Sequence, residues 1–257
     1  MSNIAKAFDH GKAFVAFITC GDPDLATTAA CVRAAVKGGA DLIELGIPFS
    51  DPTAEGPVIQ EANERALKGG VTTDRIFELV KDLRTDVTVP MVFMTYANVV
   101  YSYGIERFCD RCVQVGIDGM ILPDVPFEEK EEFAPACRAR GLSFVSLIAP
   151  TSANRVAMIA KEAEGFLYIV SSLGVTGERS KITTDIAAMV KLVRENTSIP
   201  CAVGFGISTP EQAGQMAALS DGAIVGSAIV RLIAEGAEDA PERVCAYVRA
   251  MKEGMRA

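Results

Sequence analysis

Short apolar segments alternate with longer amphipathic segments along almost the whole chain. The apolar segments have the length of buried strands, and the segments between them space apolar residues three or four positions apart, as helices do. Examples are ATTAACVRAAVKGGA, GIERFCDRCVQVG and KEEFAPACRARG, and several such segments end at glycine, a common residue at helix C-termini. The eight predicted strands are AFVAFIT, DLIEL, MVFMTY, GMILPD, SFVSLIA, FLYIVSS, CAVGFG and GAIVGS, beginning near positions 13, 41, 91, 119, 143, 166, 201 and 222.

Strands that alternate with helices indicate parallel β-α-β units, and eight such units favour a closed (β/α)₈ barrel. We therefore expect residues 1–257 to form a single TIM-barrel domain of the α/β class, with a short N-terminal helix and long loops after strands 2 and 6. A doubly wound open sheet is the alternative. After CAVGFG, Ser208 and Glu211 match a capping box with Pro210 in the first turn, which predicts a helix start there.

Charge and composition argue against several classes of protein. A net charge of −8 argues against an extended nucleic-acid surface, which needs clustered Lys and Arg. No segment approaches the ~18 apolar residues of a membrane helix, and no targeting segment is recognisable. The seven cysteines are scattered and odd in number, which suits a reducing cytoplasm better than a disulfide framework. We expect a cytoplasmic protein that binds small molecules.

The segment DLIELGIPFSDPTAEGPVIQ, residues 41–60, contains the most informative acids. It places Glu44 inside an apolar strand and Glu55 in the loop that follows. A buried carboxylate is unfavourable unless it is paired, protonated or used in chemistry. Prolines and glycine stiffen the loop, so a substrate held between the two acids would need little ordering of the chain.

Active sites of (β/α)₈ barrels form at the carboxyl ends of the strands, so polar residues there are candidates. The first four strands end near Thr19, Glu44, Tyr96, Asn98 and Asp124. The later strands are instead followed by glycines, whose backbone N–H groups can approach an anion closely. We therefore expect a phosphate ester as the substrate. The glycine-containing segments are SSLGVTGE, GFGIS and VGSAIV.

Six motifs in the same order resemble the tryptophan synthase α-subunit family over essentially the whole chain. They are LIELGIPFSDP-x-A-[acid]-GP-x-IQ, MTYANVVYSYG, LPDVP, SSLGVTG, GFGIS and IVGSAIV. The resemblance implies a lyase that splits indole-3-glycerol phosphate into indole and glyceraldehyde 3-phosphate in tryptophan biosynthesis. It implies no cofactor in this chain, and a pyridoxal-phosphate-dependent β subunit that receives the indole through a tunnel in an αββα heterotetramer.

The reaction explains the need for two acids. Indole becomes a leaving group only after its C3 atom is protonated, and the family pattern assigns this proton transfer to Glu44. The second carboxylate, at Glu55, would face the indole N–H and stabilise the positive charge that develops on the ring. We expect Glu44 to have the raised pKa and Glu55 to be ionised. The family usually has Asp at position 55, and our hypothesis is that Glu55 performs the same role.

The resemblance also implies a set of residues around the two acids. Thr176 would lie on a mobile loop that closes over the substrate. Asp51 and Asp124 would meet the β subunit, although both also suit turns or helix caps. The implied substrate-binding residues are Phe17, Thr19, Tyr96, Tyr168, Thr176, Gly177, Phe205, Gly206, Gly226 and Ser227, and the implied partner-interface residues are Pro48, Asp51, Asn98, Asp124 and Pro126.

Three further features receive no functional role. Cys109 and Cys112 have metal-site spacing but no second pair, so we expect packed thiols and no metal. His10 is expected to face solvent, and the acidic residues at 128–132 are interpreted as the solvated first turn of a helix. Two alternatives remain open: another phosphate-binding barrel enzyme, and a catalytically weakened subunit that acts mainly as an allosteric activator of a β subunit.

Overall fold

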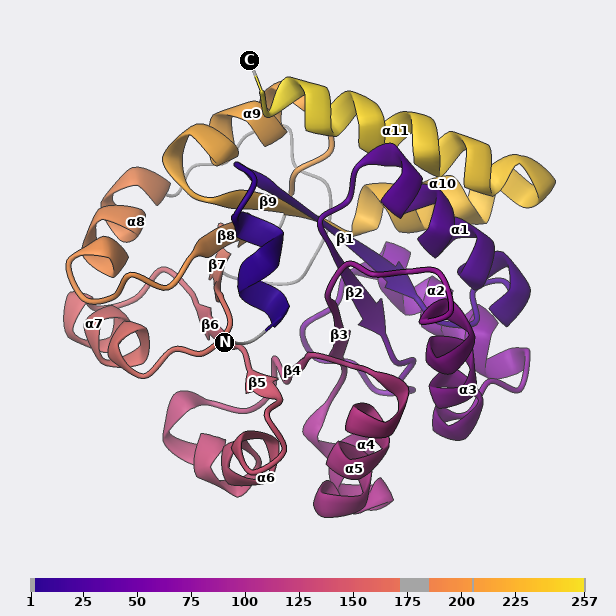
Figure 1. Cartoon of the computed structure of the whole chain (residues 1–257), viewed down its shortest axis with the longest axis horizontal. Coiled ribbons are helices and arrows are strands. Elements are labelled where there is room, and N and C mark those ends of the chain that lie inside the picture. The colour runs from indigo at the N-terminus through magenta and orange to yellow at the C-terminus, as the bar shows by residue number, and fades with distance from the viewer. Residues whose placement is uncertain (1–2, 172–184, 205, 257) are drawn as a thin grey trace.

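The computed structural model describes residues 3–171, 185–204 and 206–256. Their strands form one parallel sheet in the order β5-β4-β3-β2-β1-β9-β8-β7-β6. Because β5 and β6 are parts of the one predicted strand SFVSLIA, interrupted at Val145, the sheet returns on itself as a barrel inside a ring of helices (Figure 1). The predicted TIM-barrel fold is confirmed. The strands are β1 (Ala13–Thr19), β2 (Leu42–Gly46), β3 (Met91–Met94), β4 (Gly119–Ile121), β5 (Ser143–Phe144), β6 (Ser146–Ile148), β7 (Leu167–Val170), β8 (Cys201–Gly204) and β9 (Gly222–Val225).

Helices connect the strands on the outside of the barrel. The long connection after β2 contains α2 and α3, whereas most of the predicted loop after the sixth strand lies outside the described residues. None of the helices in the described ranges is long and apolar enough to cross a membrane. The helices are η1 (Asn3–Phe8), α1 (Leu25–Gly38), α2 (Pro57–Lys68), α3 (Thr73–Leu83), α4 (Ala97–Tyr103), α5 (Ile105–Val115), η2 (Phe127–Glu132), α6 (Ala134–Arg138), α7 (Ala153–Lys161), α8 (Ile186–Arg194), α9 (Pro210–Leu219), α10 (Ser227–Gly236), η3 (Ala237–Asp239) and α11 (Ala240–Gly254).

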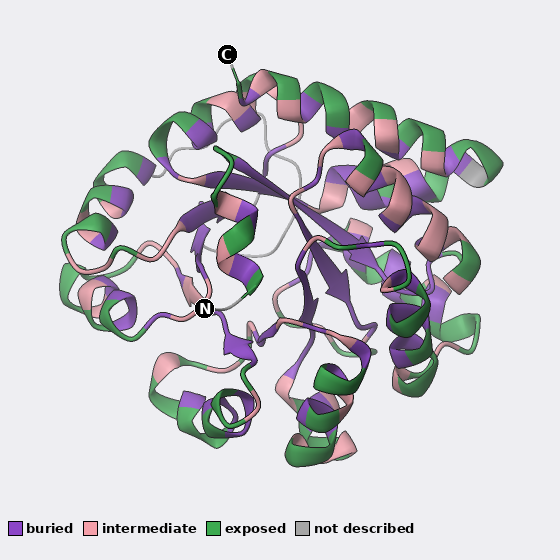
Figure 2. Cartoon of the chain, in the orientation of Figure 1, coloured by how far each residue is buried: buried purple, intermediate pink, exposed green. Residues whose placement is uncertain are grey.

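Alternate residues of each strand pack into two apolar layers. Ile43 and Leu45 of β2 belong to the cluster between the barrel and its helices. Leu42 belongs to a second cluster inside the barrel, together with Val15 and Phe17 of β1. Apart from β6, where Ser146 and Leu147 are half-buried, the strands are buried on both faces (Figure 2), which explains why their sequences are nearly continuously apolar. Glu44 lies two positions after Leu42, and side chains two positions apart on a strand lie on the same face. The Glu44 side chain therefore points into the barrel interior.

The N-terminal helix η1 closes the amino end of the barrel. Ile4 and Ala7 join the interior cluster, and the Phe8 ring lies 5.8 Å from the Phe166 ring. The Asn3 Nδ2 atom donates to Asp118 Oδ1 at 3.0 Å, just before β4 begins. These contacts fill the amino end of the strands, so the carboxyl end is left for the site.

Two local predictions need correction. The capping box of α9 is formed by Thr209 and Gln212, one residue later than predicted, because the Gln212 amide supplies the reciprocal bond. The predicted helix over KEEFAPACRARG is divided into η2 and α6, since Pro135 has no N–H and its ring is incompatible with a continuous helix. The acidic residues of η2 are exposed as predicted, but Lys130 among them is buried.

Candidate active site

Glu44 is a fully enclosed acid at the centre of the barrel. It lies opposite Phe17 of β1 and opposite Val92 of β3 in the sheet register. Its residue surface is 1 % exposed, and its Oε2 atom makes no hydrogen bond within the described part of the chain. A buried carboxylate with an oxygen that receives no hydrogen bond is disfavoured in its charged form. Glu44 is therefore suited to hold a proton.

Glu55 occupies the loop between β2 and α2 and is also buried. The Asn63 Nδ2 atom of α2 donates to Glu55 Oε2 at 2.6 Å. The adjacent Ala54 N–H donates to the Tyr96 hydroxyl at 3.0 Å, and the Phe49 ring stacks on Tyr96 with a centroid distance of 5.2 Å. The loop is thus held to α2 by Asn63 and to the start of α4 by Tyr96.

The surroundings raise the pKa of both acids. Burial, with a smaller contribution from the charge of Glu55, raises the pKa of Glu44 to about 8. Burial raises the pKa of Glu55 to about 7, against the opposing effect of the Asn63 hydrogen bond. Glu44 has the higher pKa, as expected from the sequence, but the raised pKa of Glu55 was not expected. Near neutral pH the pair can hold one proton on Glu44 while Glu55 is ionised.

Two aromatic side chains approach glycines closely beside these acids. A Cβ atom at Gly46 would lie 2.6 Å from Phe17 Cζ, and one at Gly204 would lie 2.5 Å from the Tyr168 hydroxyl oxygen. Both aromatic residues are buried in the interior cluster. Burial and the charge of Glu44 raise the pKa of Tyr168, so this side chain stays a neutral phenol near Glu44. Glycine is required here because any larger residue would displace the rings.

Of the glycine-containing segments expected to bind phosphate, the structure describes VGSAIV completely and the others in part. Gly206 has a φ of +83°, a left-handed conformation that favours glycine. Gly226 directly precedes α10, and the Val230 N–H donates to its carbonyl at 3.0 Å. Ser227 is the first residue of α10, so the partial positive charge of the helix N-terminus lies at this position. The predicted residues Thr176, Gly177 and Phe205 lie outside the described residues.

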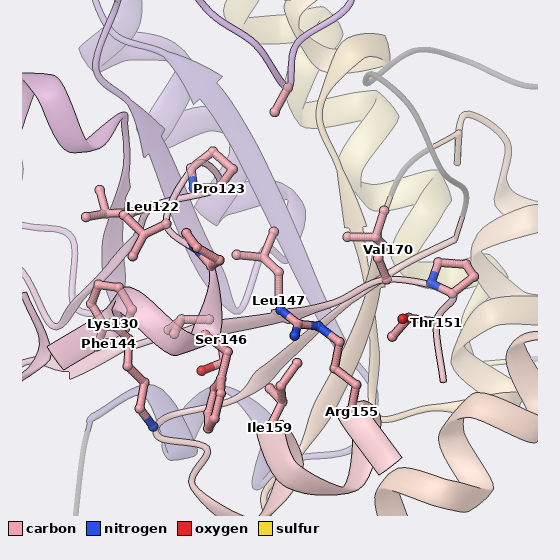
Figure 3. Close-up of a pocket in the computed structure, with 17 residues that line it drawn as sticks. Leu122, Pro123, Lys130, Phe144, Ser146, Leu147, Thr151, Arg155, Ile159 and Val170 are labelled. Atoms are coloured by element: carbon pink, nitrogen blue, oxygen red, sulfur yellow. The ribbon is translucent and has the colours of Figure 1, made fainter. Parts of the chain in front are cut away.

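A cavity of about 410 Å³ opens at the carboxyl ends of β4 and β6. It is bordered by Ala54, next to Glu55, and by Val170, two residues after Tyr168 on β7. Figure 3 shows apolar side chains including Leu122 and Leu147 around it, with the Arg155 side chain extending from α7. The lining is mainly apolar, which suits a hydrophobic group, and it also includes the charged residues Lys130 and Arg155.

The predicted partner-interface residues lie on the loops around the same end. Asp51, Asn98, Asp124 and Pro126 are exposed, whereas Pro48 is buried. The Asp124 carboxylate accepts two hydrogen bonds from the Ala97 N–H, at 3.0 and 3.1 Å. Asp124 therefore caps α4 and joins the loop after β4 to the helix that contains Asn98.

Sequence reasoning missed the residues of α2 that hold the loop of Glu55. The Gln60 Nε2 atom donates to the Glu55 carbonyl oxygen at 2.6 Å, and Asn63 donates to its carboxylate. A detectable signal existed, because Asn63 lies at helical spacing among the apolar residues Ile59, Ala62 and Ala66 on the buried face. A single polar residue on such a face indicates a buried polar partner.

Other polar groups fit a structural role. The Cys109 Sγ atom lies 3.8 Å from the Sγ atom of Cys137 of α6, so Cys109 packs against a thiol from outside the CxxC motif. No group of three His, Cys, Asp or Glu side chains within the described ranges could hold a metal ion. Asp22 is buried at the end of the barrel, where it receives two hydrogen bonds from Arg65 of α2 at 2.7 and 2.9 Å.

Comparisons with known proteins agree with this geometry. The family model described as "Tryptophan synthase alpha chain" matches residues 4–256. A tryptophan synthase alpha chain of Lacticaseibacillus casei is 45 % identical over 98 % of this chain and 95 % of that protein. One of Lactiplantibacillus plantarum is 48 % identical over 91 % and 89 %, respectively. The crystal structure of tryptophan synthase subunit alpha from Legionella pneumophila is similar, with a TM-score of 0.91, 37 % identity and coverage of 100 % of this chain and 99 % of that one.

Proposed function

This chain belongs to the tryptophan synthase alpha chain family, whose members are lyases that act on indole-3-glycerol phosphate, and we propose that Glu44 and Glu55 perform the reaction. One observation supports this assignment above the others: Glu44 on β2 and Glu55 in the loop after β2 are both buried, and the pKa of each is raised. A pair of acids with unequal pKa values can supply one protonated and one ionised group at the same pH.

Glu44 has the properties of the proton donor. In the proposed step its carboxylic acid protonates C3 of indole, which gives an indolenine. The resulting carboxylate accepts the proton of the neighbouring glycerol hydroxyl as the C–C bond breaks, and the bonding electrons return to the indole ring. The products are indole and the aldehyde of glyceraldehyde 3-phosphate, and Glu44 ends the cycle protonated again.

Glu55 acts on the other side of the ring. Its ionised carboxylate would accept a hydrogen bond from the indole N–H and stabilise the positive charge that develops when C3 is protonated. The apolar cavity beside Ala54 offers space for the indole group. Gly206, Gly226 and Ser227, at the glycine-rich end, would bind the phosphate through backbone N–H groups.

The partner follows from the family. The alpha chain itself needs no cofactor, because pyridoxal phosphate is held by the β subunit of tryptophan synthase. Residues 1–257 act as one domain and meet the β subunit through the exposed residues Asp51, Asn98, Asp124 and Pro126, with the buried Pro48 supporting this loop surface. The complex is an αββα heterotetramer in the cytoplasm.

Indole release by two isosteric variants tests the assignment. We expect Glu44→Gln and Glu55→Gln each to lower turnover by about 10²–10⁴-fold, the usual contribution of a positioned acid or base. Glu64→Gln is a matched control, because Glu64 is an exposed glutamate of α2 that pairs with Lys68 of the same helix. Full turnover by either active-site variant would show that its role is wrong. A wild-type chain that stimulates a β subunit but releases no indole would instead favour the activator function.

A further inference from the structure

The Asn63 side chain makes a direct contact with one of the two proposed acids. Only 4 % of Asn63 is exposed, and its Nδ2 atom lies 2.6 Å from Glu55 Oε2. An amide N–H can only donate, so this contact requires a lone pair on the carboxyl oxygen. A carboxylate offers such lone pairs on both oxygens, and a hydrogen bond to the charged form favours that form.

Asn63 belongs to a helix whose position is firmly fixed. The Arg65 guanidinium binds the buried Asp22 carboxylate through two parallel hydrogen bonds, which tie α2 to the loop after β1. Gln60 donates to the Glu55 carbonyl, and Tyr96 accepts from the Ala54 N–H. The backbone around Glu55 and the amide of Asn63 are therefore held in one relative geometry.

We propose that Asn63 is a positioning residue that holds the Glu55 carboxylate at one place in the site and favours its ionised form. The inference rests on the proposed function of Glu55. It also explains how glutamate can serve at a position where the resemblance implies aspartate. The added methylene lengthens the side chain by about 1.5 Å, and the bond to α2 fixes where the longer side chain ends. A misplacement of about 1 Å can lower a rate about a hundredfold.

The local charges make the ionisation of Glu55 depend on this bond. The charge of Glu55 acts on Glu44 of β2 and on the hydroxyl of Tyr96, the residue before α4, and raises the pKa of both. Burial raises the pKa of Tyr96, so it remains neutral, and Glu44 is protonated below about pH 8. Asn63 is the group that lowers the pKa of Glu55 against its burial.

The first experiment measures indole release against pH for the full chain and for Asn63→Ala, with indole-3-glycerol phosphate as the substrate. Loss of the donor should raise the pKa of Glu55, so the acid side of the profile should move upward by about one pH unit. At pH 7 the ionised fraction of Glu55 and with it kcat should fall by about fivefold, while KM changes little, because the lost interaction acts mainly in the transition state. Asn63→Asp keeps the shape but adds a second carboxylate, and it should move the profile further.

Gln60→Ala is the matched control, because Gln60 binds the Glu55 backbone rather than its carboxylate. This variant can lower the rate, but it should leave the acid side of the profile in place. A residue that only filled space would lower thermal stability without moving the profile, so an unshifted profile for Asn63→Ala would overturn the proposal.

A double-mutant cycle separates this proposal from the function of Glu55. If Asn63 acts through Glu55, adding Asn63→Ala to Glu55→Gln should cause no further loss of kcat. Equal losses in both backgrounds would overturn the positioning role while leaving the function of Glu55 intact. Full turnover by Glu55→Gln alone would instead refute the function of Glu55, whatever the result for Asn63.

Discussion

Replacing Gly204 by alanine should displace Tyr168 and weaken both the fold and the site. The new Cβ atom would lie 2.5 Å from the Tyr168 hydroxyl oxygen, 2.6 Å from its Cε1 atom and 2.7 Å from its Cζ atom. All three separations are far below an ordinary contact distance for carbon and oxygen. The ring is 5 % exposed and neighbours the Phe166 ring, so it has little space to retreat.

The size of the effect follows from the kind of clash. Overfilling a packed core usually lowers the free energy of unfolding by about 1–3 kcal/mol. For a chain of this length each kcal/mol lowers Tm by about 2–4 °C. Because Tyr168 lies near the buried Glu44, the same displacement should also lower the rate of indole release.

Thermal unfolding followed by circular dichroism measures the first effect. Gly226→Ala is the matched stability control, because its Cβ atom would come no closer than 3.4 Å, to Phe17. We expect Gly204→Ala to lower Tm and Gly226→Ala to change it little. Adding Tyr168→Leu to Gly204→Ala should recover part of the loss, whereas Tyr168→Phe should not, since the ring carbons still clash. An unchanged Tm for Gly204→Ala, or equal losses for both glycines, would refute the reasoning.

Three further predictions concern charge and thiols. Indole release should rise with pH through about 7 as Glu55 ionises and fall above about 8 as Glu44 loses its proton, and a profile that is flat from pH 6 to pH 9 would contradict both roles. Arg65→Ala should lower the free energy of unfolding in urea by about 3 kcal/mol, because it leaves the buried Asp22 carboxylate unpaired, and a loss below about 1 kcal/mol would contradict the importance of that pair. Of the seven cysteines, Cys245 is the only one that is not fully buried, so a thiol reagent should label one site quickly in the native chain, and Cys245→Ser should remove this fast phase. Fast labelling that persists in that variant would be contrary evidence.

Much of the fold could be predicted because the strands other than β6 are buried on both faces. A strand between the barrel interior and the helices must be apolar along its length, and AFVAFIT is an example that became β1. The interruption of SFVSLIA at Val145 has no such signal, because the residues on both sides are equally compatible with a strand. Likewise, the one-residue shift of the α9 cap depends on whether Glu211 or Gln212 reaches back, and the spacing of polar residues permits both.

The site was predictable only in part. Glu44 is recognisable because an acid inside an apolar strand is unusual, and Glu55 because it belongs to a long motif with prolines and glycine. The spacing of Asn63 marks it as a polar residue on a buried helix face, but its partner depends on α2 folding back against its own preceding loop, which local sequence does not specify. The raised pKa of Glu55 is likewise a consequence of tertiary burial.

The most direct test of the central claim is indole release from indole-3-glycerol phosphate, by the isolated chain and then with a tryptophan synthase β subunit added. Our account predicts indole from the chain alone and a strong increase with the partner, since it assigns Glu55 the role of the second acid. No indole in either case, with phosphate-ester binding intact, would contradict the claim that Glu44 and Glu55 form a working catalytic pair.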